Sequence, residues 1–227
     1  MPLDTARIQA LCFDVDGTLN DTDDLYAHRF TSWLRPLRWL FPRQDTLAFA
    51  RHLVMFTETP AQFFFGLPDR LGFDDRINAL GDWLHQRSVA RRNASFSILP
   101  GIQEMLQALQ PHYPLSVVTA RGQRTTLRFL EEYNLHQHFT SVASGQTCRH
   151  TKPFPDPVLW AARQMSVPPQ NCLMIGDTVV DILAGKAAGA QTVGVLCGFG
   201  TQTELLRAGA DLVLPSTAMI VEALGKN

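Results

Sequence analysis

Short apolar runs alternate with amphipathic segments along most of the chain after residue 97. Each run is apolar almost throughout, which is typical of a strand buried on both faces of a parallel sheet. The segments between the runs have apolar residues at helical spacing and begin or end near proline or glycine. With one further run near the N-terminus, the pattern predicts strands at 8–13, 115–119, 139–143, 172–176, 191–196 and 211–214. Strands that alternate with helices predict βαβ units and a parallel α/β sheet.

Residues 21–97 have a different character. This stretch contains no convincing buried strand, and its apolar residues at helical spacing predict several helices. A structureless connection of this length is improbable inside a compact domain. We therefore predict an all-helical cap domain at residues 21–97, inserted after the first strand of a catalytic core that comprises residues 1–20 and 98–227.

The composition is that of a globular protein: 45% of the residues are hydrophobic, 18% are charged, and the formal net charge is −1. A charge so near zero gives no field that would attract nucleic acid or an anionic membrane surface. No apolar run is long enough to span a membrane, and the N-terminus lacks the pattern of a signal peptide. The cysteines (Cys12, Cys148, Cys172 and Cys197) are far apart, as expected for reduced thiols. The sequence thus predicts a cytoplasmic protein without nucleic-acid or membrane partners.

The first predicted strand ends in two carboxylates, Asp14 and Asp16, followed by Gly17. In open α/β sheets, ligands bind outside the carboxyl ends of the strands. In a regular strand these two side chains would point the same way, and two like charges about 4 Å apart repel by roughly 4 kcal/mol at an effective dielectric constant near 20. A divalent cation, a shared proton or a basic partner would offset that repulsion. Alternatively, the Asp-Gly step is only the turn that ends the strand.

Polar residues stand at the ends of other predicted strands and in one loop. They are Thr119, Ala120 and Arg121 after the second strand, Asp177 and Asp181 after the fourth, and Lys152 before a helix. Each has an ordinary structural alternative as a strand end, a helix cap or an exposed side chain. If all strands are parallel, however, these ends share one edge of the sheet, and the chance that they meet there by accident is small.

Such a group of side chains suits phosphoryl transfer. Several carboxylates around a small cavity suit Mg²⁺, a hard cation that prefers oxygen ligands. A carboxylate can attack phosphorus to form an aspartyl-phosphate. A second acid two residues away could protonate the leaving oxygen and then activate water. A lysine and a hydroxyl could hold the phosphoryl oxygens as charge develops on them.

These motifs, in this order, resemble those of the haloacid dehalogenase superfamily of phosphohydrolases. The matching segments are Asp14-Val15-Asp16-Gly17-Thr18-Leu19, Val117-Val118-Thr119, Lys152-Pro153, and Gly176-Asp177 with Asp181. Residues 152–157 look like the corresponding segment of the phosphoglycolate-phosphatase-like subgroup. The resemblance implies an α/β fold with a Rossmann-like, doubly wound parallel sheet and a helical cap after the first strand.

The resemblance also implies a role for each residue near the substrate. It implies that Asp14 is the nucleophile and that Asp16 is the general acid and base. It implies that Thr119 and Lys152 bind the phosphoryl group, with Ala120 beside Thr119 in the same segment. The substrate would be a small phosphorylated metabolite.

A metal site is the second implication of the resemblance. Asp14, Asp177 and the backbone carbonyl of Asp16 would hold Mg²⁺. Asp181 matches the second acid of the fourth motif, and we expect it to act behind the metal ligands or through a water.

Two segments depart from the usual family pattern. Many relatives have an apolar residue, Asp and Ser after the leucine of the first motif, whereas this chain has Asn20-Asp21-Thr22. Relatives often have Asn after the hydroxyl of the second motif, and here Ala120-Arg121 follows Thr119. Arg121 could reach an anionic substrate or support the local structure, and we favour the structural role slightly.

The residues favour a phosphatase over related activities. Asp16 argues against dehalogenation, because a halide leaving group needs no acid. Phosphonate hydrolysis would need a Schiff-base lysine in the cap, and residues 21–97 contain no lysine. A phosphomutase stays open, because it uses the same aspartyl-phosphate. A receiver domain also gathers acids, a Thr and a Lys, but there the phosphorylated acid lies mid-chain and no insertion follows the first strand.

Neither the phosphate ester nor the oligomeric state follows from the sequence. Substrate choice should lie in the predicted cap, where Phe63-Phe64-Phe65 could form an apolar ceiling or simply the core of a helical bundle.

Overall fold

The computed structural model describes residues 3–21 and 96–225. Apart from its first residue and its last two, the predicted helical cap at 21–97 lies outside the described residues. The cap, the Phe63-Phe64-Phe65 segment within it and the domain boundaries therefore stay predictions.

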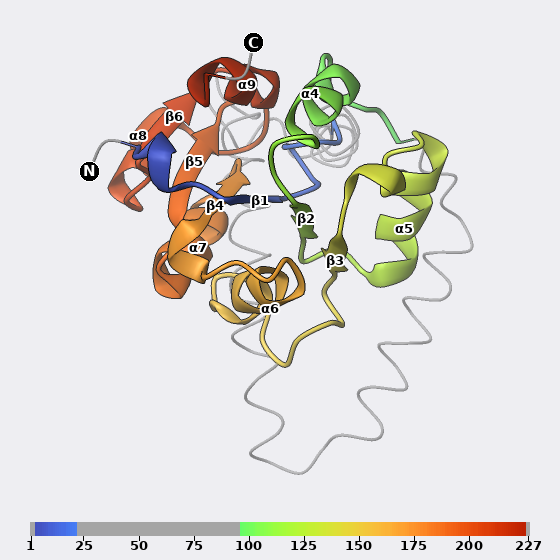
Figure 1. Ribbon diagram of the computed structural model, residues 1–227, viewed down its shortest axis with the longest axis horizontal. Helices are drawn as coiled ribbons and strands as arrows, with labels where there is room; N and C mark the ends of the chain where they lie inside the picture. The colour runs from blue at the N-terminus through green and yellow to red at the C-terminus, as the bar shows by residue number, and fades with distance from the viewer. Residues whose placement is uncertain (1–2, 22–95, 226–227) are drawn as a thin grey trace, which may run out of the picture. The chain divides into compact units, whose positions relative to one another are not determined.

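Six parallel strands form one sheet in the order β3-β2-β1-β4-β5-β6, with β1 and β4 at its centre (Figure 1). The strands are β1 (Ala10–Phe13), β2 (Leu115–Val118), β3 (Ser141–Ala143), β4 (Cys172–Gly176), β5 (Gln191–Val195) and β6 (Leu212–Leu214). The strand order runs outward from β1 in both directions, which is the arrangement of a doubly wound fold. The prediction of a parallel α/β sheet is confirmed.

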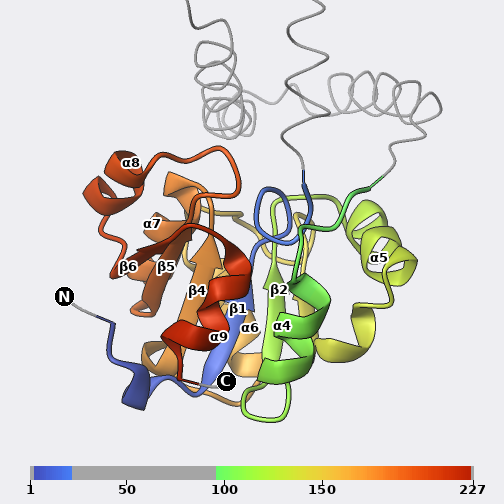
Figure 2. The ribbon, with the colours of Figure 1, turned by 90° about the horizontal axis from the view of Figure 1, so that it is seen from above.

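Helices cover both faces of this sheet. They are α4 (Ile102–Leu109), α5 (Gln123–Glu132), α6 (Asp156–Gln164), α7 (Val179–Ala188), α8 (Gln202–Arg207) and α9 (Ile220–Ala223). Short 3-10 turns cover Thr5–Arg7, His136–His138, Pro169–Asn171 and Thr217–Met219. Figure 2 shows α4 and α9 in front of the sheet and α6 behind it. The layers are thus helix, sheet and helix.

The central strand β1 shows why its sequence is apolar without interruption. Leu11 and Phe13 belong to the hydrophobic core that α4, α5 and α9 cover. Ala10 and Cys12 belong to a second core against α6 and α7. Because neighbouring strand residues point to opposite faces and both faces are covered, every residue of β1 is buried.

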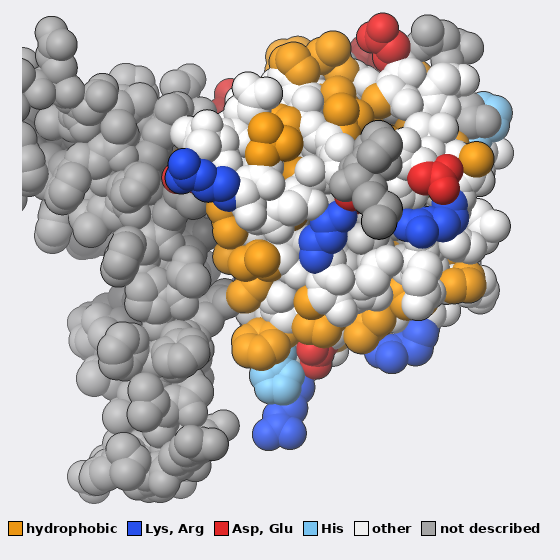
Figure 3. All heavy atoms as spheres, turned by 90° about the vertical axis from the view of Figure 1, so that its left-hand side faces the viewer, with side chains coloured by type: hydrophobic (Ala, Val, Ile, Leu, Met, Phe, Trp, Pro, Cys, Tyr) orange, Lys and Arg blue, Asp and Glu red, His pale blue; other side chains and the backbone are white. Residues whose placement is uncertain are grey.

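The surface of the described core carries charges of both signs. On the face drawn in Figure 3, basic and acidic side chains lie among polar and apolar ones. Within residues 3–21 and 96–225, no helix combines the length and apolarity that crossing a membrane requires.

Candidate functional site

Three adjacent strands deliver the predicted site residues to one edge of the sheet. Phe13 of β1 lies beside Val117 of β2 and Ile175 of β4 in the sheet register. Asp14 follows β1 directly, and its N–H donates to the carbonyl oxygen of Ile175 at 3.0 Å. Because parallel strands end at the same edge, Asp14 comes close to the residues that follow β2 and β4.

Lys152 joins two of the predicted carboxylates. Its Nζ lies 2.7 Å from Oδ1 of Asp14 and 2.5 Å from Oδ1 of Asp181. All three side chains are buried. Lys152 comes from the loop before α6, so the geometry brings a loop residue between the ends of β1 and β4. Lys152 thus lies beside the acids, where the sequence predicts an ammonium group.

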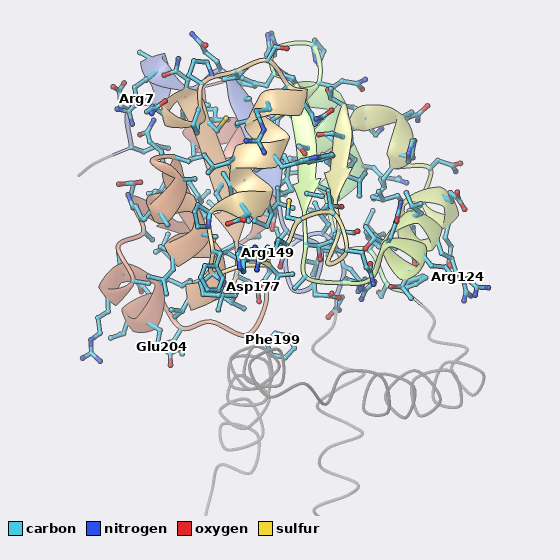
Figure 4. All side chains as sticks on the ribbon, turned by 90° about the horizontal axis from the view of Figure 1, so that it is seen from below. Arg7, Arg124, Arg149, Asp177, Phe199 and Glu204 are labelled. Atoms are coloured by element: carbon cyan, nitrogen blue, oxygen red, sulfur yellow. The ribbon has the colours of Figure 1, made fainter. Side chains whose placement is uncertain are left out.

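Asp177 lies at the end of β4 and is fully buried. Its Oδ1 accepts a hydrogen bond from Oγ1 of Thr18 at 3.3 Å, and its Oδ2 accepts from the backbone N–H of Phe199 at 2.8 Å. Figure 4 shows Asp177 at this edge of the sheet, with Phe199 further out. Two loops therefore orient this carboxylate, one after β1 and one after β5.

Two glycines make room for Asp177. Gly17 has a φ of +73°, and a Cβ added to it would lie 2.3 Å from Oδ2 of Asp177. A Cβ at Gly198 would lie 2.1 Å from the same oxygen. Real side chains do not tolerate such distances, so both loops can pack against the carboxylate only because these residues have no side chain.

The buried charges at this site do not balance. Asp14, Asp177 and Asp181 bring three carboxylates, and Lys152 brings one ammonium, which leaves two negative charges in excess among these residues. Burial raises the pKa of Asp14 from 3.8 to about 7, although Lys152 acts in the opposite direction. Burial likewise raises the pKa of Asp177 well above its ordinary value. The site is thus destabilised when its acids are ionised without a further cation.

Burial alone would lower the pKa of Lys152, but the neighbouring Asp14 and Asp181 outweigh it and the net shift is upward. Lys152 therefore carries a positive charge across the physiological pH range. This ammonium is a permanent donor and counter-charge at the end of β1.

A divalent cation fits the donor set. Carboxylate oxygens of Asp14, Asp177 and Asp181 lie within 4.8 Å of one another. Oxygen donors are the ligands that Mg²⁺ prefers. A charge of +2 would also match the two excess negative charges. Asp14 and Asp177 are the better ligands, because Asp181 accepts three hydrogen bonds, from Lys152 and twice from Thr178, whereas Asp177 accepts two from uncharged donors.

The role of Asp181 in the local structure is clear from its partners. Its Oδ1 accepts from Lys152, and its Oδ2 accepts from the N–H of Thr178 at 3.0 Å and from the Thr178 hydroxyl at 2.6 Å. Asp181 thus closes the first turn of α7 and fixes Lys152 at the same time. The expectation that Asp181 acts behind the metal ligands stays a prediction.

Asp16 faces a different partner. The guanidinium of Arg121 binds its carboxylate through two nitrogens: Nε donates to Oδ2 at 2.9 Å, and Nη2 donates to Oδ1. Asn20 also donates to Oδ1 of Asp16, at 3.3 Å. The slightly favoured structural role of Arg121 stays a prediction, and the structure adds this contact with the predicted general acid.

Thr119 and Ala120 follow β2 at the same edge. Thr119 is buried, and its hydroxyl oxygen accepts a hydrogen bond from the backbone N–H of Arg121 at 3.1 Å. The Thr119 hydroxyl therefore keeps its proton available for another acceptor. Ala120 is exposed.

Sequence reasoning missed several residues that shape the site. Thr18 orients Asp177, Asn20 touches Asp16, and Gly198 and Phe199 pack against Asp177. One signal was available: the Gly-Phe-Gly segment at 198–200 follows a predicted strand, where glycine allows the backbone to approach a ligand or a buried group closely.

Comparison with known proteins gives consistent results. Residues 11–195 match the family described as haloacid dehalogenase-like hydrolase. The phosphoglycolate phosphatase of Shigella boydii is 33% identical over 235 residues, which cover 96% of this chain and 93% of that protein. The pyrophosphatase PpaX of Anoxybacillus flavithermus is 28% identical and covers 96% of this chain and 98% of its own length.

A solved structure shows the same fold. It is a HAD family hydrolase from Deinococcus radiodurans with bound phosphate and sodium, with a TM-score of 0.68 and 24% sequence identity. The similarity covers 97% of this chain and 96% of that one. The Rossmann-like architecture implied by the sequence motifs is thus shared with a known hydrolase.

Proposed function

We propose that this chain, a member of the haloacid dehalogenase-like hydrolase family and a phosphoric monoester hydrolase, acts on a small phosphomonoester. It uses Mg²⁺ and forms an aspartyl-phosphate on Asp14. The observation that carries the proposal is the buried contact of Asp14 with Lys152 beside Asp177 at the carboxyl edge of the sheet. A carboxylate so placed has the ammonium of Lys152 next to it at the carboxyl edge of the sheet.

Asp14 starts the reaction as nucleophile. One of its carboxylate oxygens attacks phosphorus, the bond from phosphorus to the leaving oxygen breaks, and Asp16 gives its proton to that oxygen. A water then attacks the phosphorus of the aspartyl-phosphate while Asp16 takes its proton. The bond to Asp14 breaks, inorganic phosphate leaves, and both carboxyl groups return to their first state.

Lys152 and Thr119 stabilise the charge on the transferring group. The ammonium of Lys152 touches Asp14, so it lies next to the oxygen that bonds to phosphorus. The hydroxyl of Thr119 can donate to a phosphoryl oxygen because its own oxygen accepts from the Arg121 backbone. We place the backbone at Ala120 in the same phosphoryl-binding segment. Donors fixed before the reaction stabilise the transition state more than mobile ones.

Asp14, Asp177 and the backbone carbonyl of Asp16 would hold the metal. When bound, Mg²⁺ supplies the positive charge that the excess of buried carboxylates lacks, and it polarises a phosphoryl oxygen. Asp181 keeps Lys152 in place from behind.

Relatives guide the choice of substrates to test. The similar proteins carry the names phosphoglycolate phosphatase and pyrophosphatase. We propose a small anionic phosphate compound of this kind as the substrate, and a cytoplasmic setting in which such metabolites occur.

The test is phosphate release from a panel that contains 2-phosphoglycolate, pyrophosphate, sugar phosphates and nucleoside monophosphates, each with Mg²⁺ and with chelator. Release from a few related compounds that needs Mg²⁺ supports the proposal. Asp14→Asn should abolish release while the far-UV circular dichroism stays that of the folded protein.

Other outcomes would identify another function. Phosphate transfer between two positions of a sugar phosphate, without net release, would indicate a phosphomutase. A stable phosphorylated protein that neither hydrolyses nor transfers its phosphate would indicate a signalling role. Full activity of Asp14→Asn would contradict the mechanism itself.

A further inference from the structure

The contact between Arg121 and Asp16 joins two segments that are far apart in the sequence. Arg121 follows β2, and Asp16, which lies 105 positions earlier in the chain, follows β1. Nε and Nη2 of one guanidinium face both oxygens of one carboxylate. A two-bond contact of this kind fixes the plane and the direction of the carboxylate, which a single donor cannot do.

Arg121 is itself held in a defined place. Its guanidinium carbon lies 5.3 Å from the ring centre of Phe96, and that ring makes an edge contact with Phe129 at 5.6 Å. The Arg121 side chain is only 15% exposed. The arginine is therefore held by a packed aromatic ring as well as by its contact with Asp16.

Hydrogen bonding by the guanidinium is directed at Asp16. Within the part of the chain that the structure describes, Nη1 of Arg121 is buried without a hydrogen-bond partner. An unpaired buried N–H group ordinarily costs free energy. Nε and Nη2 of the same guanidinium nevertheless stay bonded to Asp16.

A second donor restrains the same carboxylate. Nδ2 of Asn20 donates to Oδ1 of Asp16 at 3.3 Å, and Oδ1 of Asn20 accepts from the backbone N–H of Ser97 at 3.1 Å. Asn20 also pairs with Ile98 through an antiparallel bridge. Asp16 is therefore restrained by two residues, Arg121 and Asn20, and its Oδ1 accepts from both. Its side chain still is 33% exposed, so one face can meet a substrate.

We propose that Arg121 is the positioning residue of the general acid: it holds the Asp16 carboxyl in the orientation from which a proton on the side facing away from the guanidinium reaches the leaving oxygen. This inference rests on the proposed function, because it assumes that Asp16 serves the leaving group. It assigns Arg121 no contact with the phosphoryl group.

The leaving group supplies the test. A simple alkyl phosphate needs a proton on its leaving oxygen, whereas an aryl phosphate with an acidic phenol leaves well without one. Arg121→Met should lower kcat for the alkyl phosphate by about 10-fold or more, with KM nearly unchanged. The same variant should lose little kcat with the aryl phosphate. Arg121→Lys should restore only part of the lost rate, because an ammonium cannot form the two-nitrogen contact.

Arg128 offers a matched control. Its guanidinium carbon lies 5.6 Å from the centre of the same Phe96 ring, and it is exposed. Arg128→Met removes an arginine from this ring without touching Asp16, so it should leave the rates for both substrates unchanged.

A double-mutant cycle separates positioning from other roles. In an Asp16→Asn background, Arg121→Met should cause no further loss with the alkyl phosphate, because the acid that Arg121 positions is already gone. Equal losses with both substrates, a raised KM with kcat unchanged, or additive losses in the cycle would each overturn the inference.

Crystal structures supply a readout that does not depend on activity. The Asp16 carboxylate should change rotamer or lose order in Arg121→Met and stay as it is in Arg128→Met; an unchanged, well-ordered Asp16 in both would overturn the inference. If the unchanged protein hydrolyses no phosphomonoester, the proposed function fails, and the crystal structures still decide whether Arg121 orients Asp16.

Discussion

At the scale of single residues, the site is a problem of buried charge. Lys152 contacts Asp14 and Asp181, and Asp177 lies close by with hydrogen bonds to uncharged donors. A buried carboxylate without a counter-charge is costly, and breaking a buried ion pair usually costs more than the pair contributes. Lys152 offsets part of the cost of the buried carboxylates, and the proposed metal would offset more of it.

Replacement of Lys152 tests this view. We expect Lys152→Met to lower the free energy of unfolding of the metal-free protein by about 3 kcal/mol at pH 8, measured by urea denaturation. The loss should shrink at pH 5, where Asp14 and Asp177 take up protons. Lys186→Met is the control: it removes the Asp211 ion pair, in which the Lys186 side chain is 35% exposed. Asp211 keeps its hydrogen bonds from Thr192, so the loss should be smaller than that of Lys152→Met. Equal losses in the two variants would contradict the argument.

The glycine next to Asp177 gives a second test at this scale. Gly198→Ala places a methyl group on an oxygen of Asp177, so we expect weaker Mg²⁺ binding by isothermal titration calorimetry and a lower kcat. Gly122→Ala is a suitable comparison, because the nearest atom to its added Cβ lies 3.4 Å away and belongs to the flexible Gln146 side chain. If Gly198→Ala bound Mg²⁺ as tightly as Gly122→Ala, the close approach would have no functional meaning.

At the scale of elements, helix α7 begins in a way that serves the site. Thr178 donates to Asp181 with both its N–H and its hydroxyl. Helix α8 begins similarly, where Thr201 donates twice to Glu204, at 3.1 and 2.6 Å. The first arrangement also orients Lys152, whereas the second lies at the surface.

This pair of helix starts gives a prediction with a built-in control. Thr178→Ala and Thr201→Ala should each lower stability by about 1 kcal/mol, seen as similar drops in melting temperature. Only Thr178→Ala should also lower kcat, because it loosens Asp181 and hence Lys152. A loss of activity in both variants, or in neither, would show that the start of α7 has no special link to the site.

The elements themselves were largely predictable from the sequence, and so was their meeting point. The apolar runs predict β1, β2, β4 and β5 because each of these strands is buried throughout. Parallel strands end at one edge, which places Asp14, Thr119 and Asp177 together. The contact of Arg121 with Asp16 was not predictable, because it depends on how far a long side chain reaches across two loops. The packing of Gly198 on Asp177 depends on the path of a loop, which has no periodic pattern.

At the scale of the whole molecule, the excess buried negative charge links folding to pH and to the metal. The folded state holds a proton on Asp14 up to a pKa of about 7, whereas its ordinary value is 3.8. The folded protein therefore binds more protons than the unfolded chain between those values, and Asp177 shifts in the same direction. These two groups make the metal-free protein less stable as the pH rises from about 4 to about 7.

The metal should reverse that trend. We expect the metal-free protein to be more stable at pH 5 than at pH 8 in chemical denaturation, and Mg²⁺ to stabilise it more at pH 8, because protons compete for the same oxygens. Asp14→Asn should flatten the dependence on pH in the absence of Mg²⁺. A metal-free protein that gained stability between pH 5 and pH 8, with no effect of Asp14→Asn, would show that the charge excess is balanced in another way.

The most direct test of the central claim is to trap the phosphorylated protein during turnover. The reaction with Mg²⁺ and the preferred substrate is quenched in acid within the first turnovers, and the peptides are analysed by mass spectrometry. Our account predicts one phosphoryl group, on Asp14, that is absent in Asp14→Asn and in the presence of chelator. Rapid Mg²⁺-dependent phosphate release with no phosphoryl group on Asp14, or with full activity retained by Asp14→Asn, would contradict it.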